Sequence, residues 1–375
     1  MTGQLAATFG NMMTKGFLST HFPGTSIEDW RSWRWQLQNR VTSATRLSAI
    51  LGRPSSQTDE MSRVVSGYPA AVTPYYLSLI QSTDKNDPVA LQCVPDVKEI
   101  SVLTGFPEDP LNEDGQMPAQ KLIHRYPDRA LAMVTQVCAT HCRHCNRKRF
   151  WKTPLHAPLK SRLSQMVRYV ENSQQIREII VSGGDPLTYD DNQLEEILSS
   201  FAEIPHVDIL RIGSRMPAVL PMRITKDLCR ILKRYRPLWF NTQFNHPDEI
   251  TPEAKNACER LQEAGIPVSN QSVLLKGVND NVEIMRRLLN GLQKISVRPY
   301  YLFHCEPVRG CGHFRTELPF GLSMMEDLRR ECSGLSLPQY VADLPGSAGK
   351  APICALSGPI KTIFKKHQDF FDNFS

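Results

Sequence analysis

From residue 130 onward, short apolar runs alternate with amphipathic stretches whose apolar residues recur at helical spacing. The apolar runs have the length of buried strands. They lie at residues 130–137, 177–181, 207–212, 238–240, 268–274, 296–303 and 339–342. About six strand–helix alternations call for parallel strands with helical crossovers. These units are too few for a closed eightfold barrel. We therefore predict an α/β fold with a partial (β/α)6 barrel, and a doubly wound open sheet is the alternative.

The chain before this alternation is mainly helical and irregular. Ser26 and Asp29 have the spacing of a capping box, and the stretch after them carries aromatic and aliphatic residues at helical spacing. We expect an N-terminal helical extension over residues 1–120, a barrel over residues 121–350 and a C-terminal tail over residues 351–375.

Composition limits the possible partners. The net charge is +6, but the basic residues are dispersed and their densest run is Arg147, Lys148 and Arg149. Nucleic acid is therefore not expected as a partner. Residues 1–8 lack the pattern of a signal peptide, and no stretch approaches the roughly 18 apolar residues of a membrane span. The ten cysteines are then most simply reduced thiols, so we expect a cytoplasmic protein.

Cys138, Cys142 and Cys145 form a C-x3-C-x2-C pattern directly after a predicted strand. Iron–sulfur clusters are commonly held by four cysteines. Three thiolates would leave one iron of a four-iron cluster open to a small molecule. Two alternatives remain on spacing alone. His141 or His144 could complete a zinc site, or the three thiols could be unrelated.

Polar and glycine-rich segments follow several of the predicted strands, and ligands gather at the carboxyl ends of parallel strands. One such segment is Ser182, Gly183, Gly184 and Asp185, where two glycines allow a close backbone approach. A plain turn between strand and helix is the alternative. Ser214 ends the next strand and is expected at the same mouth.

Two further segments carry candidate ligands. Arg125, Tyr126 and Arg129 precede the first predicted strand and suit a phosphate, although a salt-bridged turn is equally compatible. Residues 343–350 form a small-residue loop that ends in Lys350. A lysine held in this way can form a Schiff base, and a surface turn with a solvated lysine is the alternative.

Taken together, these segments resemble a known family. Residues 138–150 resemble the cluster loop of radical S-adenosylmethionine (SAM) enzymes. The whole set, over about residues 85–360, closely resembles the lysine 2,3-aminomutase family. The matching segments are 124–129, 138–150, 182–187, 213–217, 241–251, 270–280 and 343–350.

The resemblance implies three cofactors and assigns residues to each. A [4Fe–4S] cluster would be held by the three cysteines named above, and pyridoxal phosphate (PLP) by Lys350. Arg125, Tyr126 and Arg129 match the segment that binds the PLP phosphate. SAM would lie near a group of strand-end residues, namely Ser182, Gly183, Gly184, Asp185, Ser214 and Gln271.

The implied reaction moves the α-amino group of an amino acid to carbon 3. It breaks an unactivated C–H bond, which acid–base side chains cannot do at neutral pH, so cofactor radical chemistry is required. The expected partners are an electron donor of the flavodoxin or ferredoxin type and possible further copies of the chain. Side-chain desaturation or oxidation with the same cofactors is an alternative outcome. A non-catalytic iron–sulfur or zinc-binding protein is another.

The resemblance also suggests the substrate. Arg147 matches the arginine that receives the α-carboxylate, and Asp343 with Glu306 matches two aspartates that meet the terminal ammonium of lysine. The two carboxylates favour a basic substrate, because they would repel the negatively charged side chain of glutamate. Glu306 in place of aspartate makes arginine a candidate beside lysine.

Two departures from the family pattern concern metals and cofactor contacts. Gln243 stands where lysine-acting members usually carry histidine, which puts one cofactor contact in doubt. Asn281 stands where some members carry a zinc-binding cysteine, and residues 361–375 contain no cysteine. We therefore predict no structural zinc.

Overall fold

The computed structural model describes residues 16–82, 84–101, 106–152, 157–346 and 349–353. Its centre is a nine-stranded sheet whose spatial order follows the chain order from β1 to β9. β2 to β8 are parallel, and the two outer strands are antiparallel to their neighbours. The strands are β1 (Leu122–Tyr126), β2 (Arg129–Thr135), β3 (Glu178–Gly183), β4 (Ile209–Gly213), β5 (Leu238–Thr242), β6 (Val268–Leu274), β7 (Arg298–His304), β8 (Gln339–Leu344) and β9 (Gly349–Pro352).

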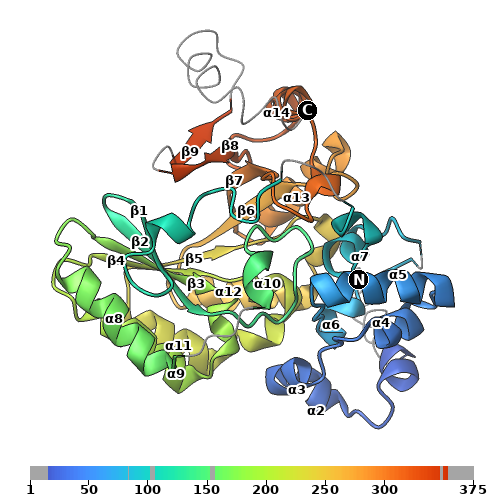
Figure 1. Cartoon of the computed structure of the whole chain (residues 1–375), viewed down its shortest axis with the longest axis horizontal. Helices are drawn as coiled ribbons and strands as arrows, with labels where there is room; N and C mark the ends of the chain where they lie inside the picture. The colour runs from blue at the N-terminus through green and yellow to red at the C-terminus, as the bar shows by residue number, and fades with distance from the viewer. Residues whose placement is uncertain (1–15, 83, 102–105, 153–156, 347–348, 354–375) are drawn as a thin grey trace.

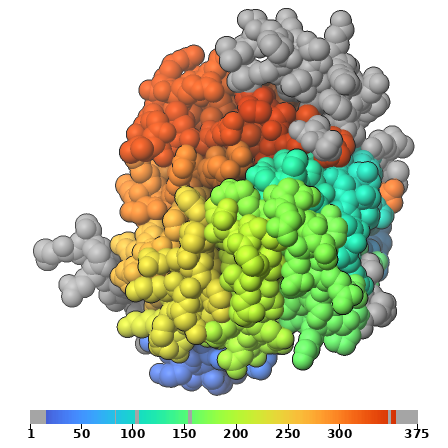
Figure 2. All heavy atoms as spheres, turned by 90° about the vertical axis from the view of Figure 1, so that its left-hand side faces the viewer, coloured from blue at the N-terminus to red at the C-terminus, as the bar shows by residue number. Residues whose placement is uncertain are grey.

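Six helices connect the parallel strands and cover the outside of the sheet (Figure 1). Figure 2 shows one outer face of the molecule, over which atoms coloured from green through yellow to orange lie side by side. They are α8 (Leu159–Glu171), α9 (Asp191–Ala202), α11 (Lys226–Arg234), α12 (Pro252–Glu263), α13 (Val282–Lys294) and α14 (Leu318–Glu331). This confirms the partial (β/α)6 barrel, with β8 and β9 following the six units. A doubly wound sheet would reverse its strand order at a switch point. The consecutive order excludes that alternative.

Local sequence signals explain where these elements begin and what they bury. Thr251 caps α12, and the proline at the first helical position suits a helix start. The side chain of Thr225 likewise caps the start of α11. Ile179 and Val181 of β3 are fully buried between the sheet and its helices. The apolar faces that the sequence predicted therefore meet in one core.

The N-terminal extension is helical, as expected, and gathers on one side of the barrel in Figure 1. Ser26 and Asp29 form the predicted capping box. Apolar residues of the extension, such as Leu47, belong to the same buried cluster as Ile212 of β4. The helices are α2 (Ile27–Arg31), α3 (Trp33–Gln38), α4 (Ala44–Leu51), α5 (Ser55–Gly67), α6 (Pro74–Leu77) and α7 (Pro88–Cys93). The division into three domains stays a prediction.

Short helical turns lie in the connections between the longer elements. Besides the helices already given, one four-residue α-helix and seven 3-10 helices are described. They are α10 (Met216–Val219), η1 (Val97–Glu99), η2 (Asp114–Gln116), η3 (Lys148–Trp151), η4 (Pro186–Thr188), η5 (Pro221–Arg223), η6 (Pro247–Glu249) and η7 (Gly312–Phe314). None of the helices in the described ranges is long and apolar enough to span a bilayer.

Two expectations about local structure were wrong. Arg125 and Tyr126 do not precede the first strand but lie on β1 itself. Lys350 does not end a loop, because it lies on β9, which forms an antiparallel hairpin with β8. Both strands are short outer strands with polar residues, so they lack the continuous apolar run by which the parallel strands are recognised.

Candidate active site

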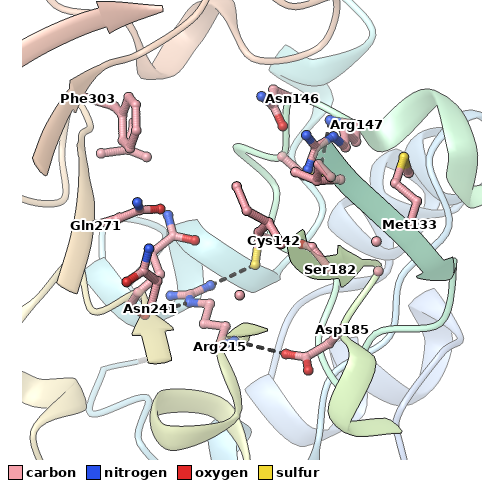
Figure 3. Close-up of a pocket in the computed structure, with 18 of the residues that line it drawn as sticks. Met133, Cys142, Asn146, Arg147, Ser182, Asp185, Arg215, Asn241, Gln271 and Phe303 are labelled. Atoms are coloured by element: carbon pink, nitrogen blue, oxygen red, sulfur yellow. Dashed lines mark hydrogen bonds between the residues drawn. The ribbon is translucent and has the colours of Figure 1, made fainter. Parts of the chain in front are cut away.

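A cavity of about 530 Å³ opens at the carboxyl ends of the parallel strands. Every residue that the family resemblance assigns to a cofactor or to the substrate lines it, from Arg125 on β1 to Lys350 on β9. Figure 3 shows side chains entering from opposite sides, with Gln271 and Asn241 facing Met133 across the cavity. The prediction that the strand-end segments share one mouth is confirmed by this lining.

The cysteine loop follows β2 and supplies three thiols to the cavity, from Cys138, Cys142 and Cys145. Burial raises the pKa of Cys138 well above its usual value, and the nearby Cys145 and Cys142 raise it further. Burial likewise raises the pKa of Cys145 to about 12. Thiols so placed ionise only when positive charge is supplied, and a metal cluster supplies it.

The donor set therefore fits an iron–sulfur cluster. In the part of the chain that the structure describes, no three His, Cys, Asp or Glu side chains are gathered as a metal site. Cys142 Sγ instead accepts a hydrogen bond from Arg215 Nη1 at 2.9 Å, as drawn in Figure 3. Cys145 Sγ accepts one from the backbone N–H of Arg147 at 3.4 Å.

Both histidines of the loop are already engaged with protein groups. His141 Nδ1 lies 2.9 Å from the carbonyl oxygen of Pro69, and its ring stacks on Trp151. His144 Nε2 lies 3.2 Å from the amide nitrogen of Gln243, the residue that departs from the family pattern. Burial lowers the pKa of His144 well below its usual value, so the ring is neutral. The structure thus gives the histidines roles in packing the loop.

Sequence reasoning missed the ion pairs that hold the cysteine loop in place. Arg143, between the second and third cysteines, pairs with Glu99 through Nε at 2.9 Å and Nη2 at 2.7 Å. Lys148 pairs with the same carboxylate at 3.0 Å. The three side chains are at most 2% exposed. Because Glu99 lies in the N-terminal extension, no local pattern near the cysteines could have revealed it.

A second buried network supports the loop from the β4 side. Arg215 Nη2 donates to Glu249 Oε1 at 2.6 Å and to the hydroxyl of Tyr76 at 3.0 Å. The Tyr76 hydroxyl donates in turn to Glu249 Oε1 at 2.7 Å. Arg215 therefore joins the N-terminal extension, the β5–α12 connection and Cys142. The sequence placed Arg215 at a strand end but gave it no role.

The glycines after β3 approach protein backbone closely. A Cβ at Gly183, whose φ is +130°, would lie 2.3 Å from the carbonyl oxygen of Thr135, and one at Gly184 would lie 2.3 Å from that of Val137. The β3 end can therefore contact the segment that leads into the cysteine loop only because both residues are glycine.

Asp185 and Ser214 form a buried pair beside these glycines. The Ser214 hydroxyl donates to both carboxylate oxygens of Asp185, at 2.8 and 3.0 Å, and the Arg215 N–H donates to Oδ2 at 2.9 Å. Burial raises the pKa of Asp185 to about 6, although these hydrogen bonds oppose the shift. The pair fixes the turn after β4 against the turn after β3.

Lys350 faces the cavity among residues from β1 and β8. Its Nζ lies 3.4 Å from the hydroxyl of Tyr126 and 3.4 Å from Asp343 Oδ2. The ring of Phe303, labelled in Figure 3, lies 5.7 Å from Nζ and adds an aromatic wall. A partly exposed lysine beside aromatic rings and a large cavity fits a PLP ring, and Arg129 nearby on β2 fits its phosphate.

Glu306 and Asp343 lie at the same end of the cavity but have different partners. Glu306 Oε2 accepts a hydrogen bond from the Asn146 amide at 2.8 Å. Asp343 Oδ1 pairs with Arg125 Nη1 at 2.8 Å. Burial and, to a smaller extent, the charge of Asp343 together raise the pKa of Glu306 to about 8. Asp343 therefore has a charged partner, whereas Glu306 has a neutral one.

Arg147 already binds a carboxylate of the protein. Its Nε and Nη2 contact both oxygens of Glu113, with the shortest distance 2.6 Å. Arg149 Nη2 also donates to Glu113, at 3.2 Å. Glu113 is 4% exposed and lies next to η2, outside every segment that the sequence singled out. The Glu113 carboxylate thus orients the guanidinium of Arg147, which is expected to receive the carboxylate of the substrate.

The chain is similar to several proteins of known family. Residues 133–289 match the model of the Radical SAM superfamily. An L-lysine 2,3-aminomutase of Clostridium subterminale is 45% identical over 88% of this chain and 80% of its own length. An L-lysine 2,3-aminomutase of Bacillus subtilis is 42% identical over 92% of this chain and 74% of its own length. A glutamate 2,3-aminomutase of Clostridioides difficile is 42% identical over 87% and 77%. The chain therefore belongs to the lysine 2,3-aminomutase family of radical SAM isomerases, whose cofactors are a [4Fe–4S] cluster, SAM and PLP.

Proposed function

We propose that this chain is a 2,3-aminomutase that acts on a basic L-amino acid, lysine or arginine, with PLP carried on Lys350. The observation that carries the proposal is the presence of Glu306 and Asp343 in the same cavity as Lys350. The charge of Asp343 already raises the pKa of Glu306, so a third carboxylate, from the side chain of a glutamate substrate, would be disfavoured there.

The cofactors supply the radical chemistry that breaks the C–H bond and the imine-forming carbonyl that carries the amino group. The residues of the chain position the substrate. Arg147, held in plane by Glu113, offers its free edge to the α-carboxylate. Glu306 receives the distal cation, so the two ends of the substrate are bound at once. Asp343 lies 3.4 Å from Lys350 and its charge acts on Glu306, so it extends the negative end of the site.

Several parts of the proposal concern partners. We infer an electron donor of the flavodoxin or ferredoxin type, because the cluster needs one electron from outside the chain. Assembly into a homo-oligomer and a cytoplasmic location stay predictions. The absence of structural zinc also stays a prediction, since residues 354–375 lie outside the described part of the chain.

The test is anaerobic reconstitution with iron and sulfide, followed by SAM, PLP, dithionite and one amino acid at a time. We expect a product of unchanged mass and altered retention from lysine, arginine or both, and none from glutamate. A product lighter by two hydrogens would favour desaturation instead. A variant with Cys138, Cys142 and Cys145 all changed to alanine serves as control. If that variant were active, the radical mechanism would be wrong.

A further inference from the structure

Three consecutive residues of the cysteine loop contact different parts of the site. Cys145 supplies one of the three thiols that line the cavity. The next residue, Asn146, donates from Nδ2 to Glu306 Oε2 at 2.8 Å. Arg147, which Glu113 orients, carries the guanidinium that is proposed to receive the α-carboxylate of the substrate. Figure 3 shows the side chains of Asn146 and Arg147 next to each other at the cavity. One short stretch therefore reaches both proposed ends of the substrate site.

The connection between β7 and α14, which carries Glu306, is attached to the cysteine loop at further points. Lys148 Nζ donates to the carbonyl oxygen of Gly310 at 2.9 Å. Cys311 Sγ donates to the carbonyl oxygen of Arg143 at 3.5 Å. Each of these two contacts involves a backbone atom, so it fixes the path of the connection against the loop. The Asn146 amide differs from them because it contacts the functional carboxylate itself.

The neutral character of Asn146 suits a carboxylate that has to bind a cation. A cationic partner, such as Arg125 on Asp343 at 2.8 Å, orients a carboxylate but also offsets its negative charge. An amide N–H orients the carboxylate and leaves its full charge. Because Asn146 contacts Oε2, the second oxygen of Glu306 is left for a ligand in the cavity that both residues line.

We propose that Asn146 is a positioning residue for substrate selection, which holds the carboxylate of Glu306 toward the distal cation of the amino acid. This inference rests on the proposed function, in which Glu306 receives that cation. Since Asn146 and Arg147 are neighbours in the chain, the cysteine loop positions the groups that bind both ends of the substrate. The choice of side chain is thereby tied to the same loop that carries the three thiols.

The first test compares ligands that differ in their distal charge. Lysine is paired with 2-aminoheptanoic acid, in which a methyl group replaces the ammonium, and arginine with citrulline, in which a urea replaces the guanidinium. Absorbance titration of the protein reconstituted with iron, sulfide and PLP, without SAM, gives each dissociation constant in the absence of turnover. We expect Asn146→Ala to reduce the preference for the charged member by about tenfold and to leave the neutral member within about twofold of wild type. A displaced loop would move Arg147 and weaken both members, so an equal loss for both overturns the proposal.

Two further variants make this comparison specific. Asn146→Ser also removes the amide and is expected to lose the preference to the same extent, so the test does not depend on one substitution. Asn241→Ala is the matched control, because it removes another asparagine that lines the cavity (Figure 3). Its preference is expected to equal that of wild type. An equal loss in the Asn241 variant would show that the preference does not depend on the contact with Glu306, and would overturn the proposal.

The second test asks whether Asn146 acts through Glu306. Glu306→Gln is made alone and together with Asn146→Ala, and the same ratios are measured. We expect the double variant to show the preference of Glu306→Gln alone, because the two residues act as one unit. Losses that add independently overturn the proposal. If wild type shows no preference within either pair of ligands, the proposed basic substrate is refuted and this inference with it. A preference that survives in both Asn146 variants refutes this inference alone.

Discussion

Glu306 leads to a prediction about pH because it is a buried acid whose hydrogen-bond partner is neutral. Burial and the charge of Asp343 raise the pKa of Glu306 from its usual value near 4.5 to about 8. At about 1.4 kcal/mol per pKa unit, this corresponds to about 5 kcal/mol of unfolding free energy. That value is an upper limit, since water entry and side-chain movement relax a buried charge.

The sign follows from proton binding. Between pH 4.5 and 8 the folded chain holds a proton on Glu306 that the unfolded chain has lost. The unfolding free energy contributed by this group is therefore fully present below pH 4.5, falls as pH rises from 4.5 to 8, and is lost above 8. Glu306→Gln cannot ionise. We expect the variant to match wild type in thermal midpoint at pH 5 and to exceed it at pH 9, measured by calorimetry of the reconstituted protein.

The same residue should control substrate binding with the opposite pH dependence. A cationic side chain needs ionised Glu306, whose population falls about tenfold for each pH unit below 8. We expect the KM for the basic amino acid to rise as pH falls from 8 to 6, and the Glu306→Gln variant to have a high KM without this dependence. A pH profile of stability that is identical in wild type and variant would refute the reasoning.

Three further predictions concern single residues. Lys350→Ala should abolish borohydride trapping of PLP, checked by mass spectrometry, and trapping that persists would show the assignment of the lysine to be wrong. Glu113→Gln should raise KM about tenfold with a smaller change in kcat, because Arg147 loses the carboxylate that orients its guanidinium; equal KM values would argue against this role. Glu99→Gln should reduce the unfolding free energy by about 3–5 kcal/mol in chemical denaturation, because it leaves two buried cations without a carboxylate. A loss below about 1 kcal/mol would show that the ion pairs of Glu99 contribute no more to stability than surface ion pairs do.

Local patterns predicted much of this protein because parallel strands and their crossover helices have strong, repeated signals. The apolar run that became β3 and the Thr251 start of α12 were readable in isolation. The same patterns missed β1 and β9, where polar residues such as Arg125 and Lys350 occupy outer strands. Whether a segment forms an outer strand depends on its pairing with one neighbouring strand. That neighbour cannot be identified from the local sequence.

For the site, the sequence by itself determined which residue types are present and that they follow strands of one sheet. The cysteine spacing, the two acids and the lysine were therefore found without coordinates. Only the tertiary structure decided their partners: Glu99 on Arg143, Glu249 on Arg215, and Glu113 on Arg147. The physical reason is that a guanidinium withdrawn from water is stabilised by a carboxylate, and for these three arginines the fold supplies it from a segment 34 to 44 residues away in the chain.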